Sequence, residues 1–449
     1  MDRRTALKIG AGLGLAGLRP LLAGKTRFDK RDPQLWGTAR NCVFINTVGG
    51  MSHVDTFDYK PGPATPNAMG QSRLSSGALW PAGIMPDLAA RGDHFTLVRS
   101  LYGVERNHQR AQFAVETGHR FNPAASLRAE VPSLGSLISV ELAGQRGADD
   151  VLPTFFAMGM RPPGTGMFPR QHNAYFLEVE NRFDREFDAY LNGDIRTRLN
   201  WLWTLDPLKQ EGHDPLGSRY LWSSAEALMF DERARAALTL DDERQLRYLP
   251  QQEDGQPYVS GRGIGEWLAQ AYQLLAADSG TRFIHIGYQD WDRHSQVYGH
   301  LAYEGPLFDR ALAAFFDEMS ETPGVEAGKS LLDETLVVVV GEFGRTPGAL
   351  NRLQGRDHFS DAFSALFAGG GVQGGRIIGA TDAVGGAVID NGWSHDRPIG
   401  LVDLSATVFS ALGIDYRRSL ADTPSGRTFY YVGRDSWAGT PHVIDPLFS

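Results

Sequence analysis

The chain has 449 residues, of which 42% are hydrophobic and 10% aromatic, so it can bury a large core. Its net charge of -9, with no long basic block, argues against a general binder of nucleic acid or of anionic membranes. These features do not exclude a small polar or apolar molecule as the binding partner.

The N-terminal segment, residues 1–24, differs in composition from the rest of the chain. Arg3 and Arg4 precede a Gly/Ala/Leu stretch, and no acidic residue follows them until Asp29. The pattern predicts a twin-arginine export signal followed by one domain over residues 25–449, the alternative being a basic N-terminus without a targeting role. Because the apolar part is shorter than the roughly 20 residues of a membrane span, we expect no stable transmembrane span in the mature chain. We expect the twin-arginine export machinery to deliver the folded protein to the periplasm or the cell exterior.

The pattern of apolar residues predicts an α/β fold. Five segments rich in β-branched and aromatic residues are predicted strands: 42–48, 94–101, 281–288, 335–343 and 363–370. Helical spacing predicts helices over 305–324 and 401–414. The order strand, helix, strand over 281–343 predicts two parallel strands that are close neighbours. The fold class is therefore a doubly wound, mainly parallel sheet flanked by helices, with a mainly helical insertion at about 186–275.

Acidic residues and histidines follow the predicted strands. In chain order the candidates are Asp55, Asn107, His108, Asp292, His294, Glu342, Arg345, Asp357 and His358. In a parallel sheet covered on both faces, ligands bind at the carboxyl ends of the strands. Carboxylates with imidazoles suit Zn²⁺, Mn²⁺ or another divalent ion, so the pattern predicts a metal site. The alternative is a set of helix caps, turn residues and ion pairs without a metal.

Four ordered motifs carry a family resemblance. GGMSHVDTFD, DWDRHSQ, GEFGRTP and GRDHF occur in this order behind the twin-arginine pattern, and the chain resembles the secreted bacterial family called domain of unknown function 1501. That family is similar to sulfatases and alkaline phosphatases. The resemblance implies an alkaline phosphatase/sulfatase-like fold that holds one or two divalent ions, Zn, Mn, Ca or Mg, at its strand ends.

The resemblance also implies roles for particular residues. Its metal ligands correspond to Asp292 and His294, with Asp290 as an alternative acid, and to Glu342, His358 and Asp55. Asp357 either binds the metal or orients His358 through a hydrogen bond.

The segment NHQRAQFAVETG resembles the sulfatase pattern C-x-P-S-R-x-x-x-x-T-G, but His108 stands where the nucleophilic Cys or Ser would be. A formylglycine sulfatase or a Ser phosphoenzyme is therefore not expected. His108 could be phosphorylated itself, act as an acid or base while metal-activated water attacks, or bind the metal. We expect Arg345 and the helix N-terminus at Asn107 to bind the anionic group of the substrate.

These features predict an exported metal-dependent hydrolase of phosphate or sulfate esters, similar to phosphatases, phosphodiesterases or sulfatases. Its substrate would be a small molecule or a polysaccharide that carries an anionic ester, and no nucleic acid partner is expected. The missing Ser or Cys favours a second function, a catalytically inactive metal-containing binding or assembly protein of the cell envelope.

Overall fold

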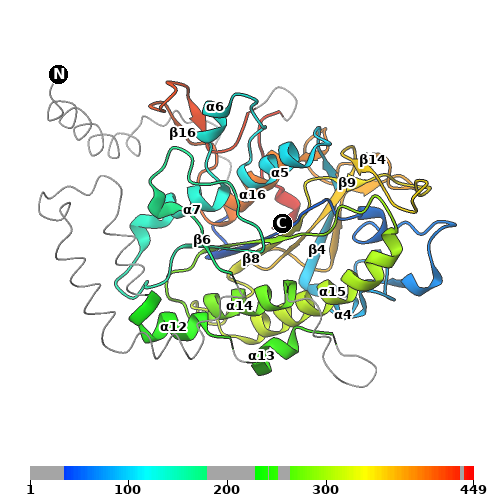
Figure 1. Ribbon diagram of the computed structural model, residues 1–449, viewed down its shortest axis with the longest axis horizontal. Coiled ribbons are helices and arrows are strands. Elements are labelled where there is room, and N and C mark those ends of the chain that lie inside the picture. Colours follow the sequence, from blue (N-terminus) through cyan, green and yellow to red (C-terminus); the bar gives the residue numbers. More distant parts are fainter. Residues whose placement is uncertain (1–34, 179–227, 241, 251–262, 435–438) are drawn as a thin grey trace, which may run out of the picture.

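The computed structural model describes residues 35–178, 228–240, 242–250, 263–434 and 439–449 (Figure 1). The predicted export signal, residues 1–24, lies outside these ranges. Among the described helices, none combines the length and the apolar character that a membrane crossing needs.

A nine-stranded, mainly parallel sheet forms the centre of the protein. Its strand order is β12-β4-β11-β8-β1-β7-β5-β6, and β15 also pairs with β4. The strands are β1 (Asn41–Thr47), β4 (Phe95–Tyr102), β5 (Phe155–Met158), β6 (Tyr175–Phe176), β7 (Phe283–Tyr288), β8 (Thr335–Val340), β11 (Phe363–Ala368), β12 (Arg376–Ile378) and β15 (Ile399–Gly400). Within this sheet β11 runs antiparallel to both of its neighbours, β4 and β8. The predicted mainly parallel sheet is confirmed.

All five predicted strands are present, as β1, β4, β7, β8 and β11. Strands β7 and β8 are parallel to each other, but β1 lies between them. In β1, Val43 pairs with Ile284 of β7 on one side and with Val337 of β8 on the other. Every residue of β8 is buried, because helices cover both faces of the sheet.

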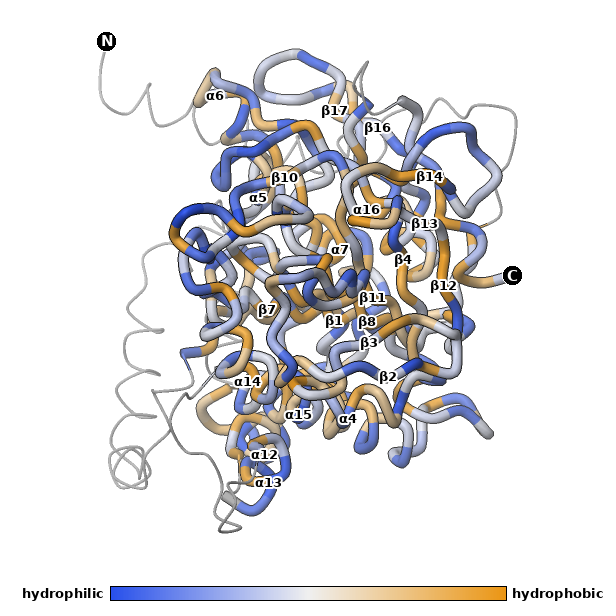
Figure 2. The backbone as a smooth tube through the Cα atoms, turned by 90° about the vertical axis from the view of Figure 1, so that its right-hand side faces the viewer, coloured by the Kyte–Doolittle hydropathy of each residue, from blue (hydrophilic) through white to orange (hydrophobic). Residues whose placement is uncertain are grey.

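Helices form a layer on each face of the sheet (Figure 1). One layer contains α4 (Pro86–Ala89), α14 (Ile264–Ala276) and α15 (Val297–Glu321), and the other contains α5 (His108–Thr117), α7 (Leu134–Leu142) and α16 (Leu401–Ala411). Alternate residues of β1 pack on opposite faces of the sheet. Val43 lies in the core on the side of α14 and α15, and Cys42 lies in the core on the side of α5 and α16. Figure 2 shows hydrophilic residues gathered in the peripheral loops.

Short ribbons complete the fold around the sheet. They pair β2 (Ser72–Arg73) with β3 (Leu79–Trp80), β9 (Gly344–Arg345) with β10 (His358–Phe359), β13 (Ala380–Thr381) with β14 (Val388–Asp390), and β16 (Ser419–Leu420) with β17 (Phe429–Tyr430). A short helix, α6 (Ala125–Ala129), follows α5.

The predicted helical insertion at 186–275 is described only in part, since residues 186–227, 241 and 251–262 lie outside the described ranges. Its described part contains α12 (Glu232–Leu238), α13 (Asp242–Arg247) and α14. Because α14 contributes buried residues to the core shared with α15, residues from 264 onward belong to the helical layer of the sheet.

Candidate metal centre

Segments that follow three parallel strands of the central sheet, β4, β7 and β8, meet at one edge of the sheet. The segment after β4 leads to His108 at the start of α5, the segment after β7 carries Asp292 and His294, and Glu342 follows β8. His358 arrives on β10, whose pairing with β9 sets it opposite Arg345. The sequence therefore predicted correctly that these side chains share one edge of the sheet.

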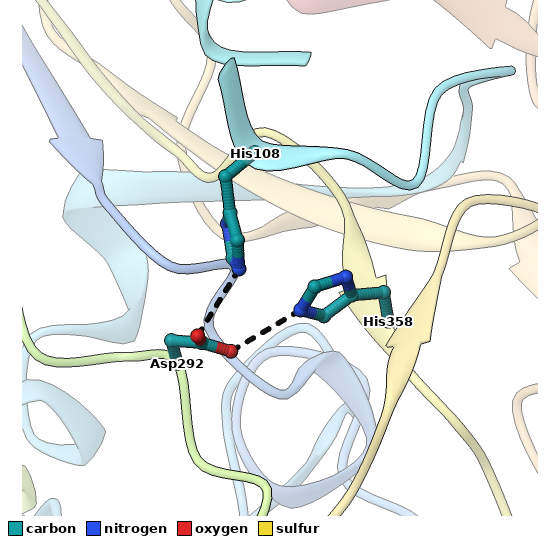
Figure 3. A group of neighbouring side chains, drawn as sticks. All are labelled: His108, Asp292 and His358. Atoms are coloured by element: carbon teal, nitrogen blue, oxygen red, sulfur yellow. Dashed lines mark hydrogen bonds and ion pairs between the residues drawn. The ribbon is translucent and has the colours of Figure 1, made fainter. Parts of the chain in front are cut away.

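The imidazole rings of His108 and His358 converge on the carboxylate of Asp292 (Figure 3), and the ring of His294 approaches the same carboxylate. The Nε2 atom of His108 lies 3.2 Å from Oδ2 of Asp292, and that of His358 lies 3.2 Å from Oδ1. The Nε2 atom of His294 lies 3.0 Å from the same Oδ1 and 2.9 Å from Nε2 of His358. His108, Asp292 and His358 thus form a group that could bind a metal, and His294 adjoins it.

Each of these rings has an oxygen acceptor at its other nitrogen, 2.7 Å from Nδ1. The acceptors are Oε1 of Glu342 for His108, Oδ1 of Asp357 for His294 and the backbone carbonyl of Arg106 for His358. A carbonyl can only accept, so Nδ1 of His358 carries the hydrogen, and a carboxylate favours the same tautomer. In this tautomer a neutral ring would direct an unprotonated Nε2 toward Asp292.

The convergence of Nε2 atoms has an electrostatic cost. Two lone pairs would face each other across the 2.9 Å between His294 and His358, next to a carboxylate. Within the described residues the buried Nε2 atom of His108 makes no hydrogen bond, although Oδ2 of Asp292 lies 3.2 Å away. A shared proton or a bound cation relieves this repulsion.

Charged neighbours adjust the acid–base properties of the cluster. Burial opposes the charge of Asp292, but the hydrogen bond and the charge of Arg345 lower the pKa of this carboxyl to about 2. The hydrogen bond to Glu342 raises the pKa of His108, whereas burial lowers the pKa of His358. Asp292 is therefore a negatively charged carboxylate at neutral pH.

Arg345 does not lie where it could bind a substrate, which corrects the predicted anion-binding role. Its side chain is only 1% exposed. Nε donates to the carbonyl of Gly50 and Nη1 to that of Arg356, both at 3.0 Å. Nη2 donates to the carbonyl of Gly49 and, at 2.5 Å, to Oδ1 of Asp292. With its donors used inside the protein, Arg345 positions Asp292.

Glu342 is fully buried and contacts the cluster through a hydrogen bond with His108. Its carboxylate accepts the backbone N–H of Gly49, at 2.9 and 3.1 Å, besides the hydrogen bond from His108. Gly49 has φ of +106°, and a Cβ there would lie 2.3 Å from the backbone nitrogen of Asp292. Glu342 thus orients His108, where a direct metal ligand was predicted.

Two further predicted residues lie outside the cluster. Asp55 is buried in an ion pair with Arg356, at 2.7 and 3.1 Å, and accepts a hydrogen bond from Ser52 at 2.5 Å, so its oxygens are used elsewhere. Asn107 is the exposed N-cap of α5, and its side chain accepts the backbone N–H of Arg110 at 3.3 Å. The structure gives Asp55 a structural role in place of the predicted one, whereas the anion-binding role of Asn107, at the predicted helix N-terminus, stays a prediction.

The two remaining predicted acids, Asp357 and Asp290, have different hydrogen-bond and ion-pair partners. Asp357 orients His294, and not His358 as the sequence suggested. Asp290, the alternative ligand, is exposed, has φ of +78° and pairs with Arg293 at 3.6 Å. The structure therefore selects Asp292 of the two acids in this loop.

Sequence reasoning missed the backbone partners of the cluster, the carbonyl of Arg106 and the N–H of Gly49. It also missed Gln112, whose amide lies 3.4 Å from Glu342. A backbone group has no residue-type signal. Gln112, one helical turn after His108 on α5, could have been found from its i, i+4 spacing.

Comparisons with known proteins give a family but no activity. The family described as "Protein of unknown function (DUF1501)" matches residues 39–438. Among the curated proteins compared with the chain, none matches it.

Several solved structures are similar to the chain. A protein in the alkaline phosphatase superfamily from Vibrio parahaemolyticus is 15% identical, with 92% of this chain and 76% of that chain covered and a TM-score of 0.38. A phosphonate monoester hydrolase from Silicibacter pomeroyi is 12% identical, over 88% and 77%, with a TM-score of 0.39. A sulfatase from Pseudoalteromonas sp. is 12% identical, over 90% and 72%, with a TM-score of 0.39. With TM-scores below 0.5, these likenesses do not assign an activity.

Proposed function

The chain belongs to the DUF1501 family, whose description assigns no activity, and we propose from the site itself that it is a metal-dependent hydrolase of phosphate or sulfate esters. One observation carries the proposal. Three imidazoles, each with Nδ1 bound to an oxygen, direct Nε2 toward a single carboxylate. Histidines that bind metals are oriented in this way.

The residues present fit a divalent cation. Ligands of tetrahedral Zn²⁺ at about 2.0–2.1 Å lie roughly 3.3 Å from one another, close to the observed 2.9–3.2 Å between Nε2 atoms and Asp292 or each other. Three carboxylates, Asp292, Glu342 and Asp357, surround the cluster, against one guanidinium, that of Arg345. The excess of two negative charges balances a divalent ion.

The donor set narrows the choice of metal. Nitrogen donors from three imidazoles suit Zn²⁺ better than Mn²⁺, Mg²⁺ or Ca²⁺, which prefer oxygen ligands. His108, Asp292, His294 and His358 would hold the ion, and Glu342, Asp357 and the carbonyl of Arg106 would orient the rings. The described residues offer one such group, so we propose one ion.

A bound divalent ion supplies a water of lowered pKa and polarises the oxygen of a phosphoryl or sulfuryl group. The protein leaves this side of the cluster accessible: the side chains of Asp292 and His358 are 45% and 21% exposed. Hydrolysis would add water across the P–O or S–O bond: a monoester would give an alcohol and inorganic phosphate or sulfate, and a phosphate diester an alcohol and a phosphate monoester.

The roles of His108 and of the anion-binding residues follow from their contacts. Both ring nitrogens of His108 face carboxylates, which supports the ligand role among the three predicted from sequence. Arg345 is buried, so recognition of the ester anion falls to the cations of the neighbouring loop. The side chains of Arg106 and Arg110 are 54% and 55% exposed on either side of His108 in the sequence.

The N-terminal segment supports export as part of this proposal. The paired arginines and the apolar stretch of residues 1–24 would direct the folded protein, with its ion inserted, to the periplasm or the cell exterior. Fusion of residues 1–30 to a reporter that is active only after export tests this, and Arg3→Lys/Arg4→Lys should abolish export.

Elemental analysis of the purified protein, followed by assays on aryl phosphate mono- and diesters and on aryl sulfates, tests the proposed function. We expect about one ion per chain and turnover that chelation and His108→Ala both abolish. A bound ion without turnover on any ester would establish the inactive envelope protein instead. That second function is favoured by the histidine at the nucleophile position. Absence of any bound ion would refute both.

A further inference from the structure

A cavity of about 600 Å³ borders the helix that carries His108. Its lining comes from the segment 105–131, which includes α5 and α6, and from the segment 423–434, which includes β17. Arg110, two residues after His108, is part of its wall. A substrate whose ester lies at the cluster could therefore extend along the first turn of α5 into this cavity.

The cavity is positively charged although the whole chain has a net charge of -9. Its charged lining consists of Arg110, Arg120, Arg427, Arg434, Glu105 and Glu130. Glu105 lies 3.8 Å from Arg110 and 3.5 Å from Arg120, so it serves two of the arginines. Within the described part of the chain, Arg427 and Arg434 form no ion pair with a carboxylate. The four arginines exceed the two glutamates by two positive charges, which suits an anionic ligand.

The uncharged lining indicates what kind of molecule carries the anionic groups. Hydroxyl and amide side chains line the cavity: Asn122, Thr423, Ser425 and Thr428. The aromatic rings already have stacking partners, because His119 stacks on Phe429 at 5.0 Å and the guanidinium of Arg434 lies 4.8 Å from the centre of Tyr430. Within the described residues the buried Nε2 atom of His119 makes no hydrogen bond. Three of these polar groups already bond within the protein: Asn122 accepts from Ala124, Thr423 donates to Arg427 and Ser425 donates to Glu130. The engaged ring faces argue against a nucleobase, which needs an aromatic platform, and so favour a hydroxyl-rich ring as the carrier of the anionic groups.

We infer that this cavity binds an acidic saccharide, with Arg427 and Arg434 contacting its sulfate, phosphate or carboxylate groups. The inference rests on the proposed function, to which it adds the substrate class: an ester of a sugar that carries a second anionic group. Arginine suits this role because its planar fork donates two parallel hydrogen bonds to such oxygens.

Calorimetric titration of the full-length protein with a chondroitin sulfate tetrasaccharide tests the inference. Arg427→Gln/Arg434→Gln should weaken binding by about tenfold or more, since charged hydrogen bonds are lost at both sites. Arg427→Lys/Arg434→Lys should restore much of the affinity. The matched control is Arg161→Gln/Arg376→Gln, which removes two exposed arginines outside the cavity and should leave binding unchanged.

Three results would overturn the inference: no binding of the tetrasaccharide, equal losses in the cavity and control variants, or tighter binding of ATP than of the saccharide. Metal content measured on the same preparations keeps this test separate from that of the proposed function. Saccharide binding that depends on Arg427 and Arg434 in a protein without bound metal would support the cavity and refute the hydrolase. Metal-dependent ester turnover without saccharide binding would support the hydrolase and refute the cavity as a saccharide site.

Discussion

Replacement of Asp357 by Asn should weaken metal binding by about tenfold, or 1.4 kcal/mol. The Asp357 carboxylate accepts the Nδ1 hydrogen of His294 at 2.7 Å and so keeps Nε2 of that ring directed at Asp292. Loss of a hydrogen-bond partner of this kind lowers metal affinity by roughly 10–100-fold. Because the Asp357 side chain is 56% exposed, we expect a loss at the lower end of this range. Asn retains an acceptor oxygen but removes the charge that makes the imidazole a stronger ligand.

Competition with a chromophoric chelator measures the affinity of the metal-stripped protein for Zn²⁺. Asp290→Asn is the matched control: it removes one carboxylate from a nearby loop, and Asn tolerates the positive φ of 78° there. We expect the affinity of this control to stay within about twofold of the unmodified protein, since the exposed Asp290 carboxylate pairs with Arg293 and not with the histidines of the cluster in the described structure. An unchanged affinity in Asp357→Asn, or an equal loss in Asp290→Asn, would refute the reasoning.

Other predictions concern the support of the site and the acid stability of the fold. Arg345→Ala should lower the unfolding free energy of the metal-stripped protein, measured in urea, by about 3 kcal/mol or more. The reason is that the substitution removes the hydrogen bonds of Arg345 to three backbone carbonyls and to Asp292. An unchanged urea midpoint would contradict this structural role and favour the anion-binding role. Gly49→Ala should lower the melting temperature of the protein more than Gly77→Ala. Both glycines have positive φ, but of the two only at Gly49 would an added Cβ clash with a neighbouring backbone. Equal losses of melting temperature would contradict this. Burial lowers the pKa of His172 to about 4, so the unfolded chain takes up a proton there between about pH 6.5 and 4 and stability falls with the pH. His172→Gln should flatten this slope by up to about 1.4 kcal/mol per pH unit, and an identical slope in urea titrations at pH 7 and 4.5 would show that His172 does not contribute.

The sequence predicted the sheet well where strands are long and apolar. The run Thr335–Val340 has no polar side chain after its first residue and is buried throughout as β8. Short strands such as β6, with two residues, have no periodic signal, and the antiparallel direction of β11 depends on pairings with β4 and β8 that are distant in sequence. The position of β1 between β7 and β8 likewise follows from long-range pairing.

The sequence predicted the location of the site better than the role of each residue. Asp292, His294, His358 and Glu342 come together because parallel strands end at one edge. Residue type alone could not show that the Arg345 guanidinium would be used by backbone carbonyls. Ligand and supporting roles depend on side-chain direction, which strand patterns leave open.

The central claim is that three histidines and Asp292 bind one divalent cation. A crystal structure with diffraction data recorded on either side of the metal's absorption edge tests it most directly. We predict one anomalous peak within about 2.0–2.3 Å of Nε2 of His108, His294 and His358 and of a carboxylate oxygen of Asp292. A peak elsewhere, or hydrogen-bonded rings with no metal in protein crystallised with excess Zn²⁺ and Mn²⁺, would contradict the claim.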